Sequence, residues 1–236
     1  MSGLRITAVP GVPEVRAGAD LVELFCAALD GAGLDVLNGD VVTVTSKVVA
    51  KAEGRVVPCA DDEEAKVALV EREAVRVLRR RGTLRLTETA HGFICANAGI
   101  DLSNTEQGTA VLLPVDPDRS ARRFRAELAR VRGVSVAVVV TDTFGRVWRN
   151  GVTDVALGSA GLRPVLDLRG TTDGNGRVLQ ATEVAIVDEL AGAVDLVLGK
   201  SSRTPFAVVR GLDASYFGEG SVKEHVVRSA NDDLFR

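Results

Sequence analysis

The chain has 236 residues, of which 46% are hydrophobic and 26% are charged, and its formal net charge is -3. A chain of this size can bury roughly 70% of the surface that it exposes when unfolded, so it needs no disulfide or structural metal to fold. The small acidic excess argues against a nucleic-acid partner, and the lack of any apolar run of about 18 residues argues against a membrane span.

Aromatic residues make up only 4% of the sequence, so the core must consist mainly of Val, Leu, Ala and Ile. The cysteines Cys26, Cys59 and Cys95 form no CxxC pair, and Cys26 and Cys95 lie in apolar patterns. Buried free thiols in a reducing compartment account for them best. Because residues 1–10 lack the features of a signal peptide, we expect a cytoplasmic protein.

The N-terminal part of the sequence predicts two helices separated by a strand. Asp20 precedes an amphipathic run, residues 21–29, and is a suitable N-cap for the first helix. Residues 40–51 are rich in β-branched residues and predict a strand that ends in a polar turn. Residues 61–81 predict the second helix, with acidic residues in its first turn and arginines in its last turn.

Shorter elements follow. They are strands at 84–89 and 92–96, a polar loop at 97–105, and a strand at 111–115. Asp116 and Pro117 then supply the N-cap and N1 residue types that begin a helix. Arginines cover much of that helix, which is the pattern of a solvated face; an anionic ligand is the alternative.

Residues 136–140 form a continuous apolar run, which predicts a strand buried on both faces. Asp142 and Thr143 follow directly, where we expect the strand to end and a glycine-rich loop to begin. A carboxylate in this position must be neutralised, because burying an unpaired charge is costly. The candidates are a divalent metal ion, Arg146 and Arg149.

The last third of the chain contains the remaining predicted elements. They are a strand at 180–187, a helix at 188–198 that is closed by Gly199 and Lys200, and a core strand at 206–210. From Leu212 the apolar pattern fades, so residues 213–236 are interpreted as a tail.

Strands and helices interleave without a strict βαβ alternation, which predicts an α+β fold with mixed sheets and packed helices. The sequence contains no GxxxxGK[ST] motif, and no GxGxxG follows a predicted strand. The usual P-loop and Rossmann nucleotide sites are therefore excluded.

Three polar clusters nevertheless lie at predicted strand ends. They are Thr45 to Lys47 with Lys51, Asp101 to Asn104, and Asp142 with Thr143. Their oxygen ligands, without His or Cys, suit Mg²⁺ or Mn²⁺ rather than zinc. Lysines beside such a metal would neutralise phosphate oxygens. These residue types indicate a metal–nucleotide site that is built without a P-loop.

Several long motifs occur together along the sequence. They are DVVTVTSKVVAKAEG at 40–54, HGFICANAGIDLSN at 91–104, LPVDPD at 113–118, VTDTFGRVWRNGVTD at 140–154, VDEL at 187–190, GK at 199–200 and PFAVVRG at 205–211. In these motifs and their order the sequence resembles the coenzyme F420:L-glutamate ligase family, and the resemblance covers about residues 5–212.

The resemblance implies a GTP-dependent amide ligase. Such an enzyme adds L-glutamate to the lactyl carboxylate of the deazaflavin precursor F420-0, and then adds further glutamate by γ-linkage. The carboxylate is expected to become an acyl phosphate that the glutamate amine attacks. The resemblance also implies two Mg²⁺ or Mn²⁺ ions per site, with K⁺ as a further candidate, and an unusual ligase fold that forms an intertwined homodimer.

Residues 1–212 would then be the ligase domain, in one or two lobes, and residues 213–236 a tail or the stub of a linker to a flavin-binding domain. By motif, Asp101 and Asp142 resemble catalytic residues that hold the first metal, and Thr143 resembles a ligand of the second. The implied nucleotide contacts are Val12, Pro13, Glu14, Val15, Ser46, Lys51, Asn104, Gly199 and Lys200.

Two other functions would use the same residues. A metal-dependent phosphotransferase or phosphatase would need Asp101, Asp142 and Thr143, and a non-catalytic module would bind GTP without turnover. Glutamate-dependent release of phosphate from GTP would separate the ligase from both alternatives.

Overall fold

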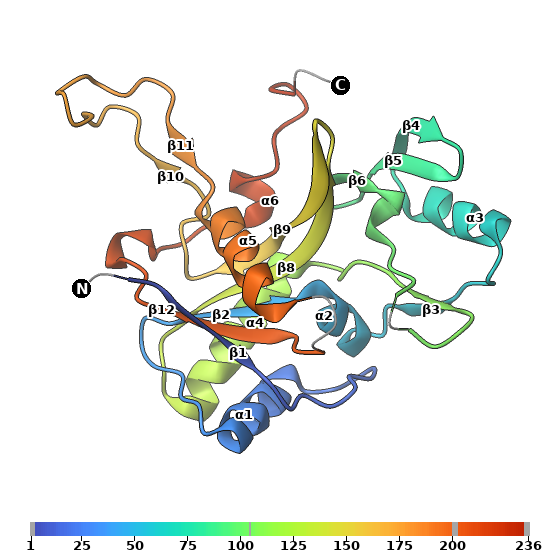
Figure 1. Cartoon of the computed structure of the whole chain (residues 1–236), viewed down its shortest axis with the longest axis horizontal. Helices are drawn as coiled ribbons and strands as arrows, with labels where there is room; N and C mark the ends of the chain where they lie inside the picture. The colour runs from blue at the N-terminus through green and yellow to red at the C-terminus, as the bar shows by residue number, and fades with distance from the viewer. Residues whose placement is uncertain (1–2, 104, 200–202, 234–236) are drawn as a thin grey trace.

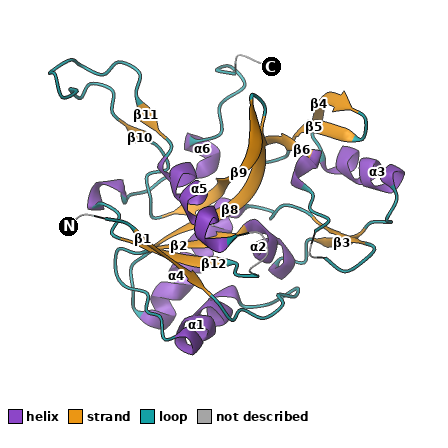
Figure 2. Ribbon diagram, viewed as in Figure 1, coloured by secondary structure: helices purple, strands orange, loops and turns teal. Residues whose placement is uncertain are grey.

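The computed structural model describes residues 3–103, 105–199 and 203–233. Its centre is a five-stranded sheet with the strand order β1-β12-β2-β8-β9 (Figures 1 and 2). The strands are β1 (Arg5–Val9), β12 (Phe206–Arg210), β2 (Val41–Thr45), β8 (Ala137–Arg146) and β9 (Arg149–Ala160). In this sheet β2 and β8 are parallel, and the other neighbouring pairs are antiparallel. The predicted mixed sheet is therefore confirmed.

Helices α1 (Leu21–Ala32) and α4 (Pro117–Arg132) pack on one face of this sheet. Each helix begins at a predicted aspartate, because Asp20 accepts hydrogen bonds from the N–H groups of the first turn of α1 and Asp116 does the same in α4. Gly158 of β9 lies directly against the first turn of α4, where a Cβ would stand 2.2 Å from a backbone carbon. Only glycine permits this close packing of α4 on the sheet.

The opposite face is covered by α5 (Ile186–Leu198) and by the C-terminal segment. That segment contains the 3₁₀ helix η2 (Ala214–Tyr216) and the short helix α6 (Val222–His225). Val222 is fully buried, and Asp118 accepts hydrogen bonds from the N–H groups of Val222 (2.9 Å) and Lys223 (3.1 Å). This part of the segment therefore packs on the core, and the assignment of residues 213–236 as a tail or the stub of a linker stays a prediction.

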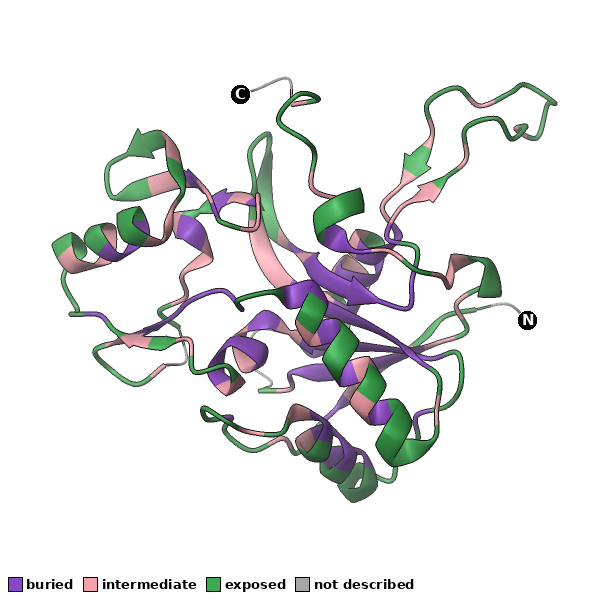
Figure 3. Ribbon diagram, turned by 180° about the vertical axis from the view of Figure 1, so that it is seen from behind, coloured by how far each residue is buried: buried purple, intermediate pink, exposed green. Residues whose placement is uncertain are grey.

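A smaller lobe packs beside the end of β2 and the β8–β9 hairpin. Its elements are α2 (Ser46–Ala52), β3 (Val56–Pro58), α3 (Glu63–Glu73), β4 (Arg76–Arg81), β5 (Leu84–Glu88), β6 (Ile94–Ala96), η1 (Asn97–Gly99) and β7 (Thr109–Val111). Strands β4, β5 and β6 form one small sheet, and β3 pairs with β7. Figure 3 shows that most buried residues lie in the central sheet and that much of this lobe is exposed.

Two hairpins project from the molecule. Strands β10 (Leu166–Asp167) and β11 (Glu183–Val184) begin a long arm that is exposed along most of its length (Figure 1). The second hairpin joins β8 to β9, and at its tip Trp148 is 80% exposed. Trp148 is the single tryptophan of the sequence.

Several predicted elements require correction. Residues 47–51 continue as helix α2, because β2 ends at Thr45. Helix α3 ends at Glu73, and the three arginines at 79–81 lie on strand β4. The strand expected at 111–115 is β7, which ends at Val111, and within 180–187 only β11 is a strand because α5 begins at Ile186.

The search for membrane-spanning segments among the described residues finds no helix that combines the required length with the required apolar character.

Candidate active site

Four segments meet at one edge of the central sheet. The register pairs Val9 with Phe206, Phe206 with Val44, and Thr45 with Thr141. The C-terminal ends of β1 and β2, and the end of the buried part of β8, therefore lie at the same edge of the sheet as the N-terminal end of β12. This edge carries the loop after β1, the start of α2, Asp142 with Thr143, and the approach to β12.

Helix α2 holds the loop after β1 in place. Lys51 is buried and forms an ion pair with Glu14, and the Gly18 N–H donates to the Ala52 carbonyl at 2.8 Å. The hydrogen bond from Lys51 is the largest of several effects that lower the pKa of Glu14, and nearby Arg203 contributes in the same direction.

The predicted nucleotide residues of the loop and of α2 are therefore neighbours. Val15 is buried, Val12 packs against the main core, and Pro13 and Glu14 are exposed between them. Ser46, the first residue of α2, is also buried. The sequence did not identify Arg203, which lies close to this group and has a positive φ of 52°.

Asp101 is paired with a lysine of α2. The Lys47 Nζ lies 2.5 Å from Asp101 Oδ2, and it also donates to the Ser103 carbonyl at 2.8 Å. The Ser103 N–H donates to Asp101 Oδ1 at 2.6 Å. Burial alone would raise the pKa of Asp101, but the hydrogen bonds from Lys47 and Ser103 together lower it. Asp101 therefore stays ionised with its charge neutralised by Lys47.

Asp142 has a different environment. The strand does not end there as we expected, because β8 continues to Arg146 and pairs with β9. The Asp142 Oδ1 accepts a hydrogen bond from the Thr143 N–H at 2.7 Å. Burial raises the pKa of Asp142 to about 6; hydrogen bonds from Thr143 and Ser46 oppose the shift, and the charges of Asp101 and Asp154 increase it.

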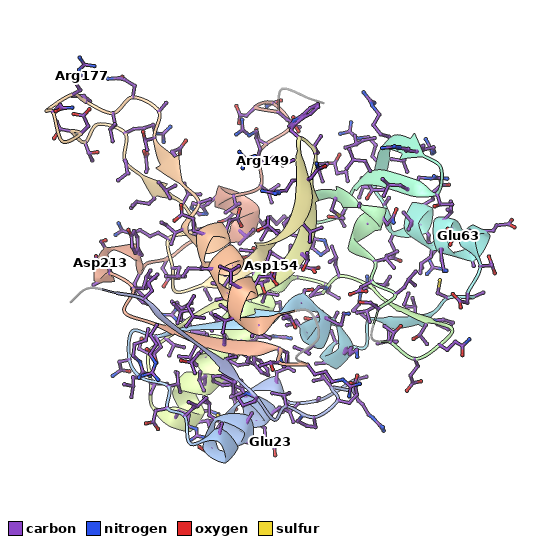
Figure 4. All side chains as sticks on the ribbon, in the orientation of Figure 1. Glu23, Glu63, Arg149, Asp154, Arg177 and Asp213 are labelled. Carbon is purple, nitrogen blue, oxygen red and sulfur yellow. The ribbon has the colours of Figure 1, made fainter. Side chains whose placement is uncertain are left out.

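Neither arginine neutralises Asp142. Arg146 donates instead to the Asn150 carbonyl at 2.7 Å, and Arg149 is exposed at the hairpin tip, whereas Asp154 lies lower on the hairpin beside α5 (Figure 4). Within the described residues, Asp142 forms no ion pair with any basic side chain. The divalent cation, the other candidate considered from sequence, stays a prediction.

Asp154 is a site residue that the sequence did not single out. It is buried, and the Thr143 hydroxyl donates to its Oδ1 at 2.5 Å. The register pairs Thr143 with Asp154 across the hairpin, so the two side chains lie on the same face. Two sequence signals pointed to Asp154: it is the last residue of the motif at 140–154, and the correct register of the β8–β9 hairpin places it opposite Thr143.

The oxygen ligands fit a hard cation, although they do not enclose one. In the described part of the chain, no group of three or more His, Cys, Asp and Glu side chains is arranged to hold a metal ion. A cation held by Asp101 and Asp142 would take its other ligands from phosphate oxygens and water, as Mg²⁺ commonly does.

The remaining predicted contacts are only partly described. Gly199 ends α5, seven residues before β12 begins at Phe206, and the Thr45 N–H donates to the Pro205 carbonyl at 3.0 Å. Residues 203–205, which precede β12, therefore lie at the same sheet edge. Asn104 and Lys200 lie outside the described residues.

The cysteines take no part in nucleophilic chemistry at this site. All three are free and buried, as expected. Burial, together with the negative charge of nearby Asp142, raises the pKa of the Cys95 thiol to about 12, so it remains protonated.

Comparison with known proteins identifies the family of the chain. The family model of the F420-0:Gamma-glutamyl ligases matches residues 11–211, which include every predicted site residue. The chain belongs to this family. It is therefore an enzyme of the ligase class.

Relatives named "Coenzyme F420:L-glutamate ligase" match almost the whole chain. The proteins from Methanothermobacter thermautotrophicus and Methanopyrus kandleri are each 38% identical to it, over 99% of the chain and 99% and 98% of their own lengths. The protein from Halobacterium salinarum is 41% identical over 97% of the chain and 94% of its own length.

Proposed function

We propose that this ligase uses GTP and divalent cations to join L-glutamate to the lactyl carboxylate of the deazaflavin precursor F420-0, and then adds further glutamate by γ-linkage. The observation that supports this most directly is the meeting of Asp101, Asp142, Ser46 and Lys51 at one sheet edge, in a chain whose relatives bear the name of this reaction.

The proposed reaction has two steps. A carboxylate oxygen of the precursor attacks the γ-phosphorus of GTP, and the bond to the β-phosphate oxygen breaks, which yields an acyl phosphate and GDP. The amine of glutamate, after losing a proton, attacks the acyl carbon, and inorganic phosphate leaves. The products are an amide, GDP and phosphate.

Specific residues of this chain have roles in that scheme. Lys51, held by Glu14 beside the loop after β1, supplies positive charge to phosphate oxygens, and the Ser46 hydroxyl lies at the N-terminus of α2, where anions are favoured. Asp101, Asp142 and Thr143 would hold two Mg²⁺ or Mn²⁺ ions, with K⁺ as a further candidate. Such cations neutralise the charge that develops during phosphoryl transfer.

We also propose that the enzyme is a cytoplasmic homodimer. The exposed apolar residues of the β8–β9 hairpin, Val147 (66%), Trp148 (80%) and Val152 (59%), support an interface at this tip. Sedimentation equilibrium should give twice the chain mass of 24.8 kDa at micromolar concentration. A mass of one chain with full ligase activity would contradict the dimer.

The function is tested by incubating the protein with F420-0, GTP, L-glutamate and Mn²⁺ and following the precursor by mass spectrometry. Successive mass increases of one glutamate residue, each with one equivalent of GDP and of phosphate, are expected. Release of phosphate that does not depend on glutamate would favour the phosphatase, and GTP binding without turnover would favour a binding module.

A further inference from the structure

A pocket of about 440 Å³ opens beside the candidate active site. Apolar side chains of the β8–β9 hairpin, β6 and the segment around α6 form most of its wall. They include Phe93, Phe144, Val155 and Val226. Its lining includes none of the nucleotide or cation contacts considered above, so it is a candidate site for a different ligand.

The pocket is continuous with Asp142 through the hairpin. Val155 is the cross-strand partner of Asp142, and Phe144 is two residues further along β8. Because side chains alternate along a strand, Asp142, Phe144 and Val155 share one face of the hairpin. A molecule that lies in the pocket can therefore extend a substituent along this face to Asp142.

Aromatic rings shape one side of the pocket. Phe93 meets Phe144 edge to face, with ring centroids 6.1 Å apart, and His91 stacks on Phe93 with centroids 5.4 Å apart. Such surfaces favour flat conjugated ligands, because these bury a large area and contact ring edges and faces at small entropic cost.

Two carboxyl groups, those of Asp188 and Asp233, line this pocket, and Asp188 is set among its apolar side chains. Asp188, in the first turn of α5, is half-buried, and its Oδ1 accepts a hydrogen bond from the Ala156 N–H at 2.9 Å. Within the described residues the other oxygen, Oδ2, has no hydrogen-bond partner. Burial raises the pKa of Asp188. A ligand N–H group would give the second oxygen the partner that it lacks.

We infer that this pocket binds the planar fused-ring part of the acceptor substrate, with Asp188 accepting a hydrogen bond from a ring N–H and the carboxylate-bearing substituent extending to Asp142. The inference rests on the proposed function, which supplies a deazaflavin as the acceptor. L-Glutamate is the poorer fit, because its two carboxylates would meet mostly apolar walls and the Asp188 carboxyl, and Arg228 is the one basic side chain among the described lining residues.

The ring site is tested with the bare deazaflavin chromophore, which lacks the lactyl phosphate substituent. Equilibrium dialysis should show that it binds the wild-type protein and competes with F420-0, but not with GTP or L-glutamate. Val226→Trp fills the pocket and should weaken chromophore binding at least about tenfold while leaving GTP binding in Mn²⁺ unchanged. Val131→Trp is the matched control, because Val131 is exposed at the end of α4.

Asp188→Asn provides a second variant that preserves the hydrogen bond from Ala156, since the amide oxygen also accepts. It should weaken chromophore binding about five- to tenfold. If Val226→Trp does not fold, Asp188→Asn decides the matter. Chromophore affinity equal to wild type in a folded Val226→Trp or Asp188→Asn protein overturns the ring site.

The two hypotheses fail in different ways. If the wild-type protein extends F420-0 with glutamate while Val226→Trp keeps the wild-type Michaelis constant for F420-0, the ring site is wrong and the proposed function stands. If chromophore binding is lost in Val226→Trp but the wild-type protein adds no glutamate, the ring site stands and the proposed function is wrong.

Discussion

On the α2 side of the candidate active site, Asp101 lies 2.5 Å from the Lys47 ammonium, whereas Asp142 on the β8–β9 hairpin has Asp154 and Asp101 as its charged neighbours. The pKa of the first carboxyl is lowered and that of the second is raised to about 6. Two aspartates assigned to one cation thus differ because one is neutralised by the protein itself. A cation bound at Asp142 would reduce the repulsion between this carboxylate and those of Asp101 and Asp154.

The largest test of this contrast is Asp142→Asn, which keeps the shape of the side chain but removes its charge. Lewis-acid stabilisation by a bound metal contributes several kcal/mol, so kcat should fall about 10³-fold or more. Asp101→Asn should behave similarly, and the double variant should lose little more, because both residues would serve one cation.

Asp35→Asn, a change to an exposed side chain on a loop outside the site, is the control and should keep wild-type activity. Circular dichroism should show that each variant is folded. Near-normal turnover of Asp142→Asn at limiting Mn²⁺ would remove Asp142 from the metal site.

Lys51→Ala tests the nucleotide side of the site and should have a smaller effect. Removing an ammonium group that contacts phosphate weakens the binding of GTP in the ground state and in the transition state alike. The Michaelis constant for GTP should therefore rise about tenfold. The constant for L-glutamate should change little. Lys66→Ala, on helix α3, is the control. An unchanged Michaelis constant for GTP would mean that Lys51 does not contact the nucleotide and that its ion pair with Glu14 is structural.

In the metal-free protein, ionisation of the buried Asp142 carboxyl should lower the free energy of unfolding. The folded pKa of about 6 lies above the ordinary value of 3.8 for an aspartate, so the protonated form is favoured in the folded state. This contribution is complete below about pH 4 and is lost as pH rises through about 6. As the pH rises through this window, the free energy of unfolding of Asp142→Asn should therefore increase by up to about 2–3 kcal/mol relative to that of wild type. Denaturant unfolding at each pH measures this difference.

Asp167 offers a comparison of opposite sign, because a hydrogen bond from Arg169 lowers its pKa to about 2. Its contribution should be present above the unfolded value and lost as pH falls toward 2. If Asp142→Asn and wild type show the same pH dependence between 4 and 6, the hairpin carboxyl is not strained.

The smallest expected effect concerns the neutralised side. The Lys47–Asp101 pair is partly exposed, with 23% and 41% of the two side chains accessible, so Lys47→Met should change the free energy of unfolding by less than about 1 kcal/mol. Without the ammonium, Asp101 should hold Mn²⁺ more tightly in the absence of GTP. Calorimetric titration showing weaker Mn²⁺ binding instead would contradict the neutralising role of Lys47.

Some of this structure was predictable because local signals sufficed. The caps at Asp20 and Asp116 fixed the starts of α1 and α4, and the apolar runs fixed the central strands. Residues 47–51 were misread because their β-branched valines favour a strand, while the packing of α2 against β2 and β8 imposes a helix. The apolar spacing of Val70, Ala74 and Val77 likewise mimicked a helix across the start of β4.

The site was predictable to the extent that it follows strand ends. Ser46, Lys51 and Asp142 come together because β2 and β8 are parallel neighbours. Asp154 and Arg203 were missed, since their positions depend on hairpin register and on the entry into β12, which no local pattern encodes.

The tip of the β8–β9 hairpin gives the molecule a built-in optical reporter. Trp148 is the single tryptophan in the chain, is 80% exposed, and lies on the hairpin that carries Asp142 and Asp154. Selective excitation of indole therefore observes this hairpin alone, without any label. If self-association covers the tip, the emission should move to shorter wavelength at high protein concentration and return on dilution. If substrate covers it, the same shift should follow the addition of substrate.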